Sequence, residues 1–350
     1  MRDVAIISFA QSVSARESER NEVEFLMPVV REAIAASGIE RSEIGFTCSG
    51  SSDFLQGQPF AFVMALDAVG AWPPIRESHV EQDGAWALYE AWVKIQTGEV
   101  ESALVYGFGK GASGDLGEIL ALSLDPYCVT PLWPHADSIA ALQARAWIEA
   151  GRGTERSLAE ITSRSRRAAR SNPHAIVSGD ETPDELLARP YVASPLRAHD
   201  CAANGDGASA VVLAAGDLAR SVCSRPAWIR GIDHRVDPAS LGVRDLTRAP
   251  SAELAGLRAG VGRDRIDVAE LYAPYAHQEA ILRQALGLPE TTNVNPSGGA
   301  LCGHVMMSCG LQRIGEVARR ILSGTADRGV GHATHGPALQ QNLVCVLEGE

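Results

Sequence analysis

Short apolar runs and amphipathic stretches alternate along the first third of the chain. A β-rich run at 4–9 precedes a stretch with helical spacing at 23–36, which ends at Gly38. The pattern continues with a strand expected at 44–48, helices at 59–69 and 85–96, and a buried strand at 103–108. Strands that alternate with helices of this length predict an α/β fold, in which helices cover both faces of a parallel or mixed sheet.

The middle of the chain has a different pattern. Residues 110–195 are rich in Gly, Pro, Arg and polar positions, with helices expected at 136–150 and 157–171 but little strand character. We therefore expect an inserted loop region that lies over the sheet. The elements expected after it are strands at 208–214, 228–232 and 266–272, a helix at 277–286, a Gly-rich turn at 297–303, a helix at 310–322 and strands up to Leu347. This second series repeats the first and predicts one duplicated fold rather than a repeat array.

Composition and charge exclude several classes of protein. Apolar residues make up 45% and charged residues 21% of the 350 positions, which is typical of a folded chain. The formal net charge of -12 leaves no basic face for a phosphate backbone, so we expect no nucleic-acid partner. No apolar run approaches the roughly 20 residues of a membrane span, and the opening segment is too short for a secretion signal. We therefore expect a cytoplasmic protein without a membrane span.

The cysteines and lysines narrow the chemistry. The seven cysteines include no CxxC pair, which favours reduced thiols over a disulfide framework or a zinc ribbon, and we expect no metal site. The only lysines are Lys94 and Lys110. Lys94 follows Glu90 by four residues on an expected helix, and Lys110 follows an expected strand, so neither is expected to form an imine with a substrate.

One segment, 293–311, concentrates chemically informative residues. It reads NVNPSGGALCGHVMMSCGL and leads into an amphipathic helix. Gly298, Gly299 and Gly303 allow the backbone to approach a ligand closely, and the helix start offers free N–H groups to a developing negative charge. The pattern alone also fits a tight turn in which His304 is a satisfied core histidine.

Four segments stand in an order that is shared with a known family. They are 100–110, a strand that ends in GxxK; 200–213, DCAANGDGASAVVL; 267–275, DVAELYAPY; and NPSGG with the GH that follows it. Together they resemble the thiolase superfamily, in particular its sterol-carrier-protein-2 branch of lipid-transfer-protein-like members. The resemblance implies the five-layered αβαβα thiolase fold, made of similar halves at 1–221 and 222–350, with the inserted loop region at 110–195. It also implies a dimer whose ligand is a coenzyme A thioester, with no permanently bound cofactor.

The departures from the family concern the reacting groups. Where thiolases carry a nucleophilic cysteine, residues 80–84 read VEQDG and Glu81 takes its place. A carboxylate cannot accept an acyl group from a thioester, because the mixed anhydride would lie uphill, so we expect no covalent Claisen chemistry there. Tyr272 stands at the family's His or Asn, His304 keeps the histidine of its GHP motif, and His335 matches its C-terminal acid–base group.

The resulting candidate catalytic residues are Tyr272, His304, His335, Asp83 and Glu81. Such weak acids and bases suit enolate chemistry, in which one group polarises a thioester carbonyl and another moves a proton. Structural alternatives stay open: Tyr272 as a core aromatic, Asp83 as a helix N-cap, and Glu81 as a position left polar after the nucleophile was lost. We expect Cys302 and Cys309 to be buried apolar residues rather than nucleophiles.

Three functions stay open at this point. The first is a retro-aldolase, a carbon–carbon lyase, that cleaves a bulky β-hydroxyacyl-CoA such as a steroid side-chain thioester in lipid metabolism and steroid degradation. The second is a non-catalytic subunit that supports a thiolase-like paralogue. The third is an acyl-CoA acyltransferase whose nucleophile has moved to Cys302. The resemblance further implies a homodimer or a heterodimer with such a paralogue, and a small OB-fold partner protein.

Overall fold

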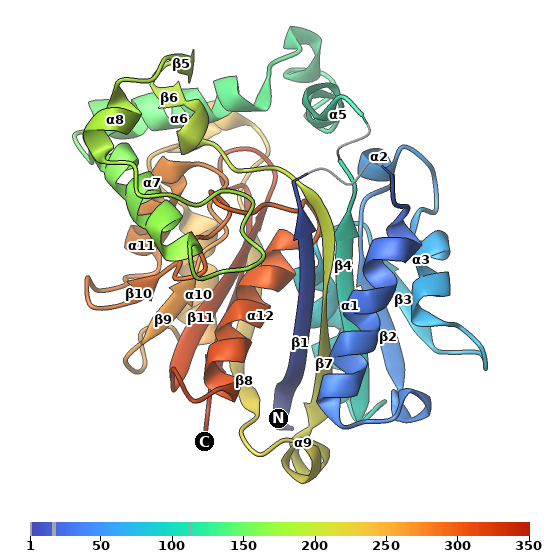
Figure 1. Cartoon of the computed structure of the whole chain (residues 1–350). Helices are drawn as coiled ribbons and strands as arrows, with labels where there is room; N and C mark the ends of the chain where they lie inside the picture. Colours follow the sequence, from blue (N-terminus) through green and yellow to red (C-terminus); the bar gives the residue numbers. More distant parts are fainter. Residues whose placement is uncertain (1, 16–18, 112–113) are drawn as a thin grey trace.

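Two series of strands and helices build the structure, a computed structural model that describes residues 2–15, 19–111 and 114–350 (Figure 1). The first series is β1 (Val4–Ser14), α1 (Glu22–Ser37), β2 (Phe46–Gly50), α2 (Asp53–Gln56), α3 (Phe62–Val69), β3 (Glu77–Val80), α4 (Gly84–Gln96), β4 (Ser102–Gly109) and, after the inserted region, β7 (Asp206–Ala215). The inserted region holds α5 (Leu116–Leu122), α6 (Ala136–Glu149), α7 (Glu155–Ala169), α8 (Pro183–Leu187), β5 (Tyr191–Ala193) and β6 (Leu196–Arg197). After α9 (Gly216–Val222), the second series is β8 (Ala227–Val236), α10 (Pro250–Ala259), β9 (Val268–Glu270), α11 (Ala276–Ala285), β10 (Asn293–Val294), α12 (Cys309–Leu322), β11 (Arg328–His335) and β12 (Gln341–Glu348).

Both series fold into sheets with the same strand order and directions. In the first, β3, β2 and β4 are parallel neighbours, and β7 and β1 follow in antiparallel pairing. In the second, β10, β9 and β11 are parallel, and β12 and β8 follow in antiparallel pairing. Strands β1 and β8 pair at Ala5 with Trp228 and at Ile6 with Ala227, and this pairing joins both units into one ten-stranded sheet. The repeated topology confirms the predicted duplication.

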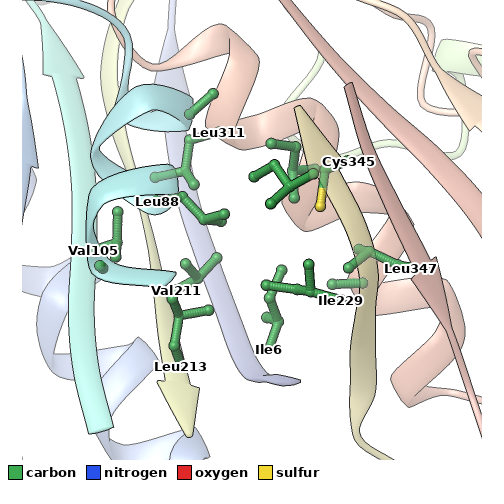
Figure 2. Packing of buried hydrophobic residues seen from close by; sticks show 14 of the residues in the cluster. Ile6, Leu88, Val105, Val211, Leu213, Ile229, Leu311, Cys345 and Leu347 are labelled. Carbon is green, nitrogen blue, oxygen red and sulfur yellow. The ribbon is translucent and has the colours of Figure 1, made fainter. Parts of the chain in front are cut away.

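Helices α4 and α12 form a layer between the two units. Figure 2 shows Leu88 of α4 and Leu311 of α12 in the same apolar region as Val211 of the first unit and Ile229 of the second. All four side chains belong to one buried apolar cluster. Because both units bury their inner faces against the same helices, neither unit completes this core alone.

Alternation along the strands supplies the outer layers. Successive side chains of a strand point to opposite faces of the sheet. In β4, Val105 joins the middle cluster, whereas Leu104 and Tyr106 pack in the cluster that α1 and α3 complete. In β12, Cys345 faces the middle, and Val344 packs in the cluster that includes α10 and α11. The layers are therefore α1 with α3, sheet, α4 with α12, sheet, and α10 with α11, as expected for a five-layered αβαβα fold.

The inserted region lies over one end of the sheet, at the top of Figure 1. Its helices α6 and α7 both contact α11 of the second unit. These two helices confirm those expected at 136–150 and 157–171. Helices α5 and α8 and the short strands β5 and β6 were not expected from the sequence.

The elements of the repeated units that were not expected include β3 and α10. The sequence of β3, ESHV, is polar and half-buried, so it lacks the apolar run that marks a strand. The buried side of α10 consists of Ser251, Ala252, Ala255, Gly256 and Ala259. Such small residues give little contrast between the two faces of a helix, which is the signal that sequence analysis uses.

Two further expectations concern the chain as a whole. Ser221, the expected division between the halves 1–221 and 222–350, lies in α9 between β7 and β8, and the exact boundary stays a prediction. Within the described residues, no helix has the length and apolar character needed to span a membrane.

Close packing at the start of α4 predicts the effect of a single methyl group. A Cβ at Gly107 of β4 would lie 2.6 Å from the Met307 carbonyl oxygen and 3.2 Å from Gly84 Cα. Because both neighbours are backbone, Gly107→Ala should lower the free energy of unfolding by about 1–3 kcal/mol. Urea unfolding measures this change.

Gly262→Ala is the matched control, because a Cβ there meets no heavy atom within 4 Å. We expect this variant to stay close to the parent protein in stability. Equal stability of the Gly107 and Gly262 variants would show that the backbone at α4 yields without cost.

Candidate functional site

The site centres on a chain of hydrogen bonds that joins Tyr272, His304 and Asn204. The Tyr272 hydroxyl lies 2.6 Å from Nε2 of His304. Nδ1 of the same imidazole lies 2.5 Å from Oδ1 of Asn204. The two rings are tilted by 51° with centroids 5.3 Å apart, so the contact is a hydrogen bond rather than a ring stack. The structure thus brings Tyr272 and His304 into contact, while their catalytic roles stay a prediction.

Backbone pairing holds this chain in place. The His304 N–H donates to the Ala203 carbonyl, and the Gly205 N–H donates to the His304 carbonyl, each at 2.9 Å. Asn204 and His304 therefore form a parallel bridge between the start of β7 and the loop before α12. Tyr272 follows β9 and belongs to the middle apolar cluster.

Hydrogen bonding and burial fix the protonation of the pair. Asn204 Oδ1 can only accept, so Nδ1 of His304 carries the hydrogen and Nε2 accepts from the Tyr272 hydroxyl. Burial lowers the pKa of His304 to about 4, and the nearby Arg313 cation acts in the same direction. Burial also raises the pKa of Tyr272 well above 10, and negative neighbours such as Asp83 add to this. At neutral pH both groups are therefore uncharged, and the Tyr272 hydroxyl donates a hydrogen bond to Nε2 of His304.

Tyr272 and His304 line a cavity of about 610 Å³ beneath the inserted region. This volume lies within the range of roughly 300–1,000 Å³ that is typical of small-molecule sites. Apolar side chains from several parts of the chain form much of its wall: Phe54, Leu55, Leu116, Ile119, Ile139 and Met306. Apolar residues outnumber polar ones in the lining, which suits a ligand with a large apolar part.

Glu81 and His335 also line this cavity. The Glu81 carboxylate accepts from the Asp53 N–H at 2.7 Å and lies 3.3 Å from Nε2 of His79, with 48% of its side chain exposed. It therefore ties the start of α2 to β3 near the cavity. Burial lowers the pKa of His335, at the end of β11, although Glu81 opposes this shift. His335 is therefore neutral at pH 7 and can donate a hydrogen bond.

Asp83 is not among the residues that line the cavity. It is the N-cap of α4 and accepts from Ala85 N–H at 2.9 Å. It also accepts from the Gly310 and Leu311 N–H groups of α12 at 2.9 and 3.0 Å. Burial raises its pKa to about 6, and these backbone hydrogen bonds oppose the shift. The structure confirms the expected N-cap and adds a second helix to it, while a catalytic role of Asp83 stays untested.

The three glycines expected at the ligand lie in a tight turn outside the cavity lining. Gly298 has φ +95° and Gly299 has φ +64°. A Cβ at Gly298 would lie 2.7 Å from Ala169 Cβ of α7, and one at Gly303 would lie 3.3 Å from the His174 carbonyl. Their geometry serves the packing of this turn against the inserted region, and contact with a ligand stays a prediction.

The cysteines in and near the cavity are poorly suited to act as nucleophiles. Cys302 and Cys309 are fully buried, and burial raises the pKa of each to about 12. Cys201 lines the cavity, but burial and the nearby Asp137 raise its pKa as well. Thiolates are therefore scarce at neutral pH at these positions. In the described ranges no group of His, Cys, Asp and Glu side chains is arranged to hold a metal ion.

Sequence analysis missed three residues of this region, Asn204, Asp137 and Tyr275. Asn204 stands in the segment DCAANGDG, whose polar loop composition was the one available signal. Tyr275 stands three residues after Tyr272, and its hydroxyl donates to Asp137 Oδ1 at 2.9 Å. Asp137 comes from the inserted region, so its place in the cavity depends on the tertiary fold.

Comparison with known proteins agrees with this architecture. No family model matches the chain. An acetyl-CoA acetyltransferase from Methanocaldococcus jannaschii is 24% identical over 350 residues, which cover 91% of this chain and 89% of that protein. A 17-hydroxy-3-oxo-4-pregnene-20-carboxyl-CoA lyase from Mycobacterium tuberculosis is 23% identical over 247 residues, which cover 67% of this chain and 63% of the lyase.

Two solved structures have the same fold. Human mitochondrial 3-ketoacyl-CoA thiolase gives a TM-score of 0.81 at 16% identity and covers 99% of this chain and 98% of its own. The Ltp2-ChsH2(DUF35) aldolase gives a TM-score of 0.81 at 18% identity, with 99% and 97% covered. The chain therefore has the thiolase fold, and its similarity to acetyl-CoA acetyltransferases supports a place in the thiolase superfamily.

The shared cap predicts an unusual cost for the loss of Asp83. Asp83→Ala leaves buried N–H groups of both α4 and α12 without an acceptor, so the free energy of unfolding should fall by about 3 kcal/mol or more. Guanidinium unfolding followed by circular dichroism measures this loss.

Asn21→Ala provides the comparison, because Asn21 caps the single helix α1 at an exposed site. That variant should lose about 1 kcal/mol. If both variants lose the same amount, the bonds from Asp83 to α12 contribute nothing to stability.

Proposed function

We propose that this chain is a carbon–carbon lyase of the retro-aldol type that acts on a bulky β-hydroxyacyl-CoA. The observation that carries the proposal is the hydrogen-bonded chain Tyr272–His304–Asn204 in the wall of a largely apolar cavity. At the place that the nucleophilic cysteine takes in thiolases stands Glu81, so the chemistry proceeds without an acyl-enzyme. The proposal places the chain with the cysteine-lacking lipid-transfer-protein-like branch of the superfamily.

Proton transfer begins at the substrate's β-hydroxyl. Its proton moves to the Tyr272 oxygen while the Tyr272 proton moves to Nε2 of His304, whose Nδ1–H continues to donate to Asn204 Oδ1. The bond between Cα and Cβ breaks, its electron pair forms the thioester enolate, and a ketone or aldehyde is released. The proton then returns through Tyr272 to Cα and yields the shortened acyl-CoA. His304 is a poor base on its own, so the negative charge of the nearby enolate is needed to stabilise its cation.

The other candidates take supporting roles. His335 donates a hydrogen bond to the thioester oxygen as negative charge develops there. Glu81 and Asp83 act as positioning residues, Glu81 for α2 and Asp83 for the starts of α4 and α12. The thioester carbonyl is the electron sink, which agrees with the lack of a suitable lysine. Coenzyme A enters and leaves as part of the substrate and product.

The acyl group is inferred to be large and apolar, as in a steroid side-chain thioester. The cavity wall is rich in aliphatic and aromatic side chains from α2, α5 and α6. The name of the mycobacterial relative describes a lyase for a steroid carboxyl-CoA, and one structural neighbour is named an aldolase. These names support the reaction class, while the low identity leaves the precise acyl group open to experiment.

A dimer and further partners complete the proposal. Strand β3 forms one edge of the ten-stranded sheet, so a second chain, identical or paralogous, can pair there. Strand β4 is paired on both sides, by β2 and β7, so it offers no free edge to a second chain. The aldolase neighbour is named for two components, Ltp2 and ChsH2, and another relative is named as a subunit of a benzoylsuccinyl-CoA thiolase. A small OB-fold protein is the partner that we expect.

Removal of one oxygen atom tests the proposed mechanism. Tyr272→Phe keeps the ring in the core and deletes the hydroxyl that links substrate and His304. Turnover should fall about 10²–10⁴-fold, the usual contribution of a general acid–base group, while the melting temperature changes little. The assay is release of a short acyl-CoA and a ketone from a tertiary β-hydroxyacyl-CoA, with partner chains present.

Tyr89→Phe is the control, because Tyr89 lies on α4 and packs against His234 outside the cavity lining. Full activity of Tyr272→Phe would contradict the mechanism. If the parent chain shows no turnover but a paralogous chain loses activity without it, the supporting-subunit alternative replaces the proposal.

Absence of an acyl-enzyme is a separate prediction. Incubation with acetoacetyl-CoA followed by intact-mass spectrometry should show the unmodified chain, because Glu81 is a poor acyl acceptor and the buried cysteines are protonated. A stable acetyl adduct mapped to Cys302 or Cys201 would instead favour an acyltransferase with a relocated nucleophile.

A further inference from the structure

A second polar group of side chains faces the cavity, between the first turns of α6 and α11. The Tyr275 hydroxyl donates to Asp137 Oδ1 at 2.9 Å. The Gln278 N–H donates to the Tyr275 carbonyl at 2.9 Å, so Tyr275 and Gln278 belong to the same helical turn. Asp137, Tyr275 and Gln278 all line the cavity, and the proposed mechanism uses none of them.

One oxygen atom of the Asp137 carboxylate is available as a hydrogen-bond acceptor. Asp137 Oδ2 lies 3.4 Å from Nδ1 of His135. That nitrogen accepts the Asp137 N–H at 3.2 Å, so in the neutral imidazole it has no hydrogen to give. Since Tyr275 occupies Oδ1, the second oxygen of Asp137 is available to a ligand.

The amide of Gln278 is oriented by Gln143 of α6. The Gln143 NH₂ group donates to the carbonyls of Leu246 and Ala338 at 3.1 and 3.4 Å. Its Oε1 therefore receives Nε2 of Gln278 at 2.9 Å and Nε2 of His277 at 3.1 Å. This network leaves Gln278 Oε1 without a donor among the described residues, although the side chain is only 3% exposed. A buried acceptor without a partner costs free energy, which a ligand donor can recover.

We propose that Asp137, Tyr275 and Gln278 form a subsite for a hydrogen-bond donor, O–H or N–H, on the bound thioester. The proposal rests on the proposed function, because it assumes that a CoA thioester enters this cavity. The donor is either a hydroxyl group on the apolar acyl part, away from the β-hydroxyl, or an amide N–H of the pantetheine arm. A keto group does not satisfy the subsite, because it has no hydrogen to give and the Tyr275 hydrogen is already bonded to Asp137.

Calorimetric titration of the full-length protein tests the subsite by binding alone. The ligands are coenzyme A, cholanoyl-CoA, its 3-, 7- and 12-hydroxy derivatives, and the same steroids as methyl esters without CoA. We expect one hydroxylated thioester to bind about tenfold or more tightly than cholanoyl-CoA. Asp137→Ala should abolish this preference and Gln278→Leu should reduce it. Glu149→Ala, which removes an exposed carboxylate from the far end of α6, should retain it.

The outcomes separate the two sources of the donor. If Asp137→Ala removes the preference for the hydroxylated thioester but leaves the affinity for coenzyme A unchanged, the donor belongs to the acyl group. If Asp137→Ala weakens coenzyme A and every thioester equally, the donor is a pantetheine amide. If both cavity variants bind every ligand as the Glu149 variant does, the proposed subsite is wrong.

The same titrations keep this proposal distinct from the proposed function. If the parent protein binds neither coenzyme A nor any thioester, the proposed function fails. In that case the methyl esters test the subsite by themselves. Tighter binding of a hydroxylated ester that Asp137→Ala abolishes supports the subsite, whereas equal binding of all the esters overturns it. Melting temperatures of the variants show whether each one is folded.

Discussion

The fold depends on one buried carboxylate that holds the starts of two helices. Asp83 accepts hydrogen bonds from the first N–H groups of α4 and of α12, which belong to different units of the repeat. Helix starts carry unpaired N–H groups and partial positive charge, so a carboxylate is the group best suited to join two of them. The approach also needs small residues, because a Cβ at Gly310 would lie 2.6 Å from the Asp83 carboxylate. The middle layer is therefore fixed at the end where the cavity lies.

The position of the reacting pair follows from this contact. Residues 304–308 lead directly into α12, so a fixed start of α12 also fixes the backbone of His304. Met307 has φ +65°, and its carbonyl receives the Gly84 N–H at 2.8 Å, which brings the loops before both helices together. The two units differ at this point. The N-cap position of α12 is Ser308, whose hydroxyl bonds to Ser209 rather than to α4. A symmetric fold thus carries an asymmetric site.

The sequence predicted what local patterns encode and missed what distant residues decide. Strong periodicity predicted α1, α4, α7 and α12. Helix α10 was missed because the side chains on its buried face are small. Asp83 was recognised as a possible cap, but its bonds to α12 span 227 residues and leave no local signal. Asn204 was missed for the same reason, since its partner His304 is 100 residues away. The glycines at 298–303 show that a visible local pattern can be ambiguous. A turn that packs on α7 and a turn that cradles a ligand need the same residues.

Burial gives the cavity its chemical character. The environment that keeps His304 neutral also keeps the thiols protonated, so thiolate chemistry is disfavoured at the same place where a neutral proton acceptor becomes available. That environment makes unpaired polar groups costly, yet the buried Gln278 retains an unpaired acceptor in the cavity wall. Stability alone would favour an apolar residue at this position. An acceptor that persists against this cost supports the proposed ligand subsite, just as the hydrogen bond between Gly84 and Met307 helps to fix the backbone that leads from His304 into α12.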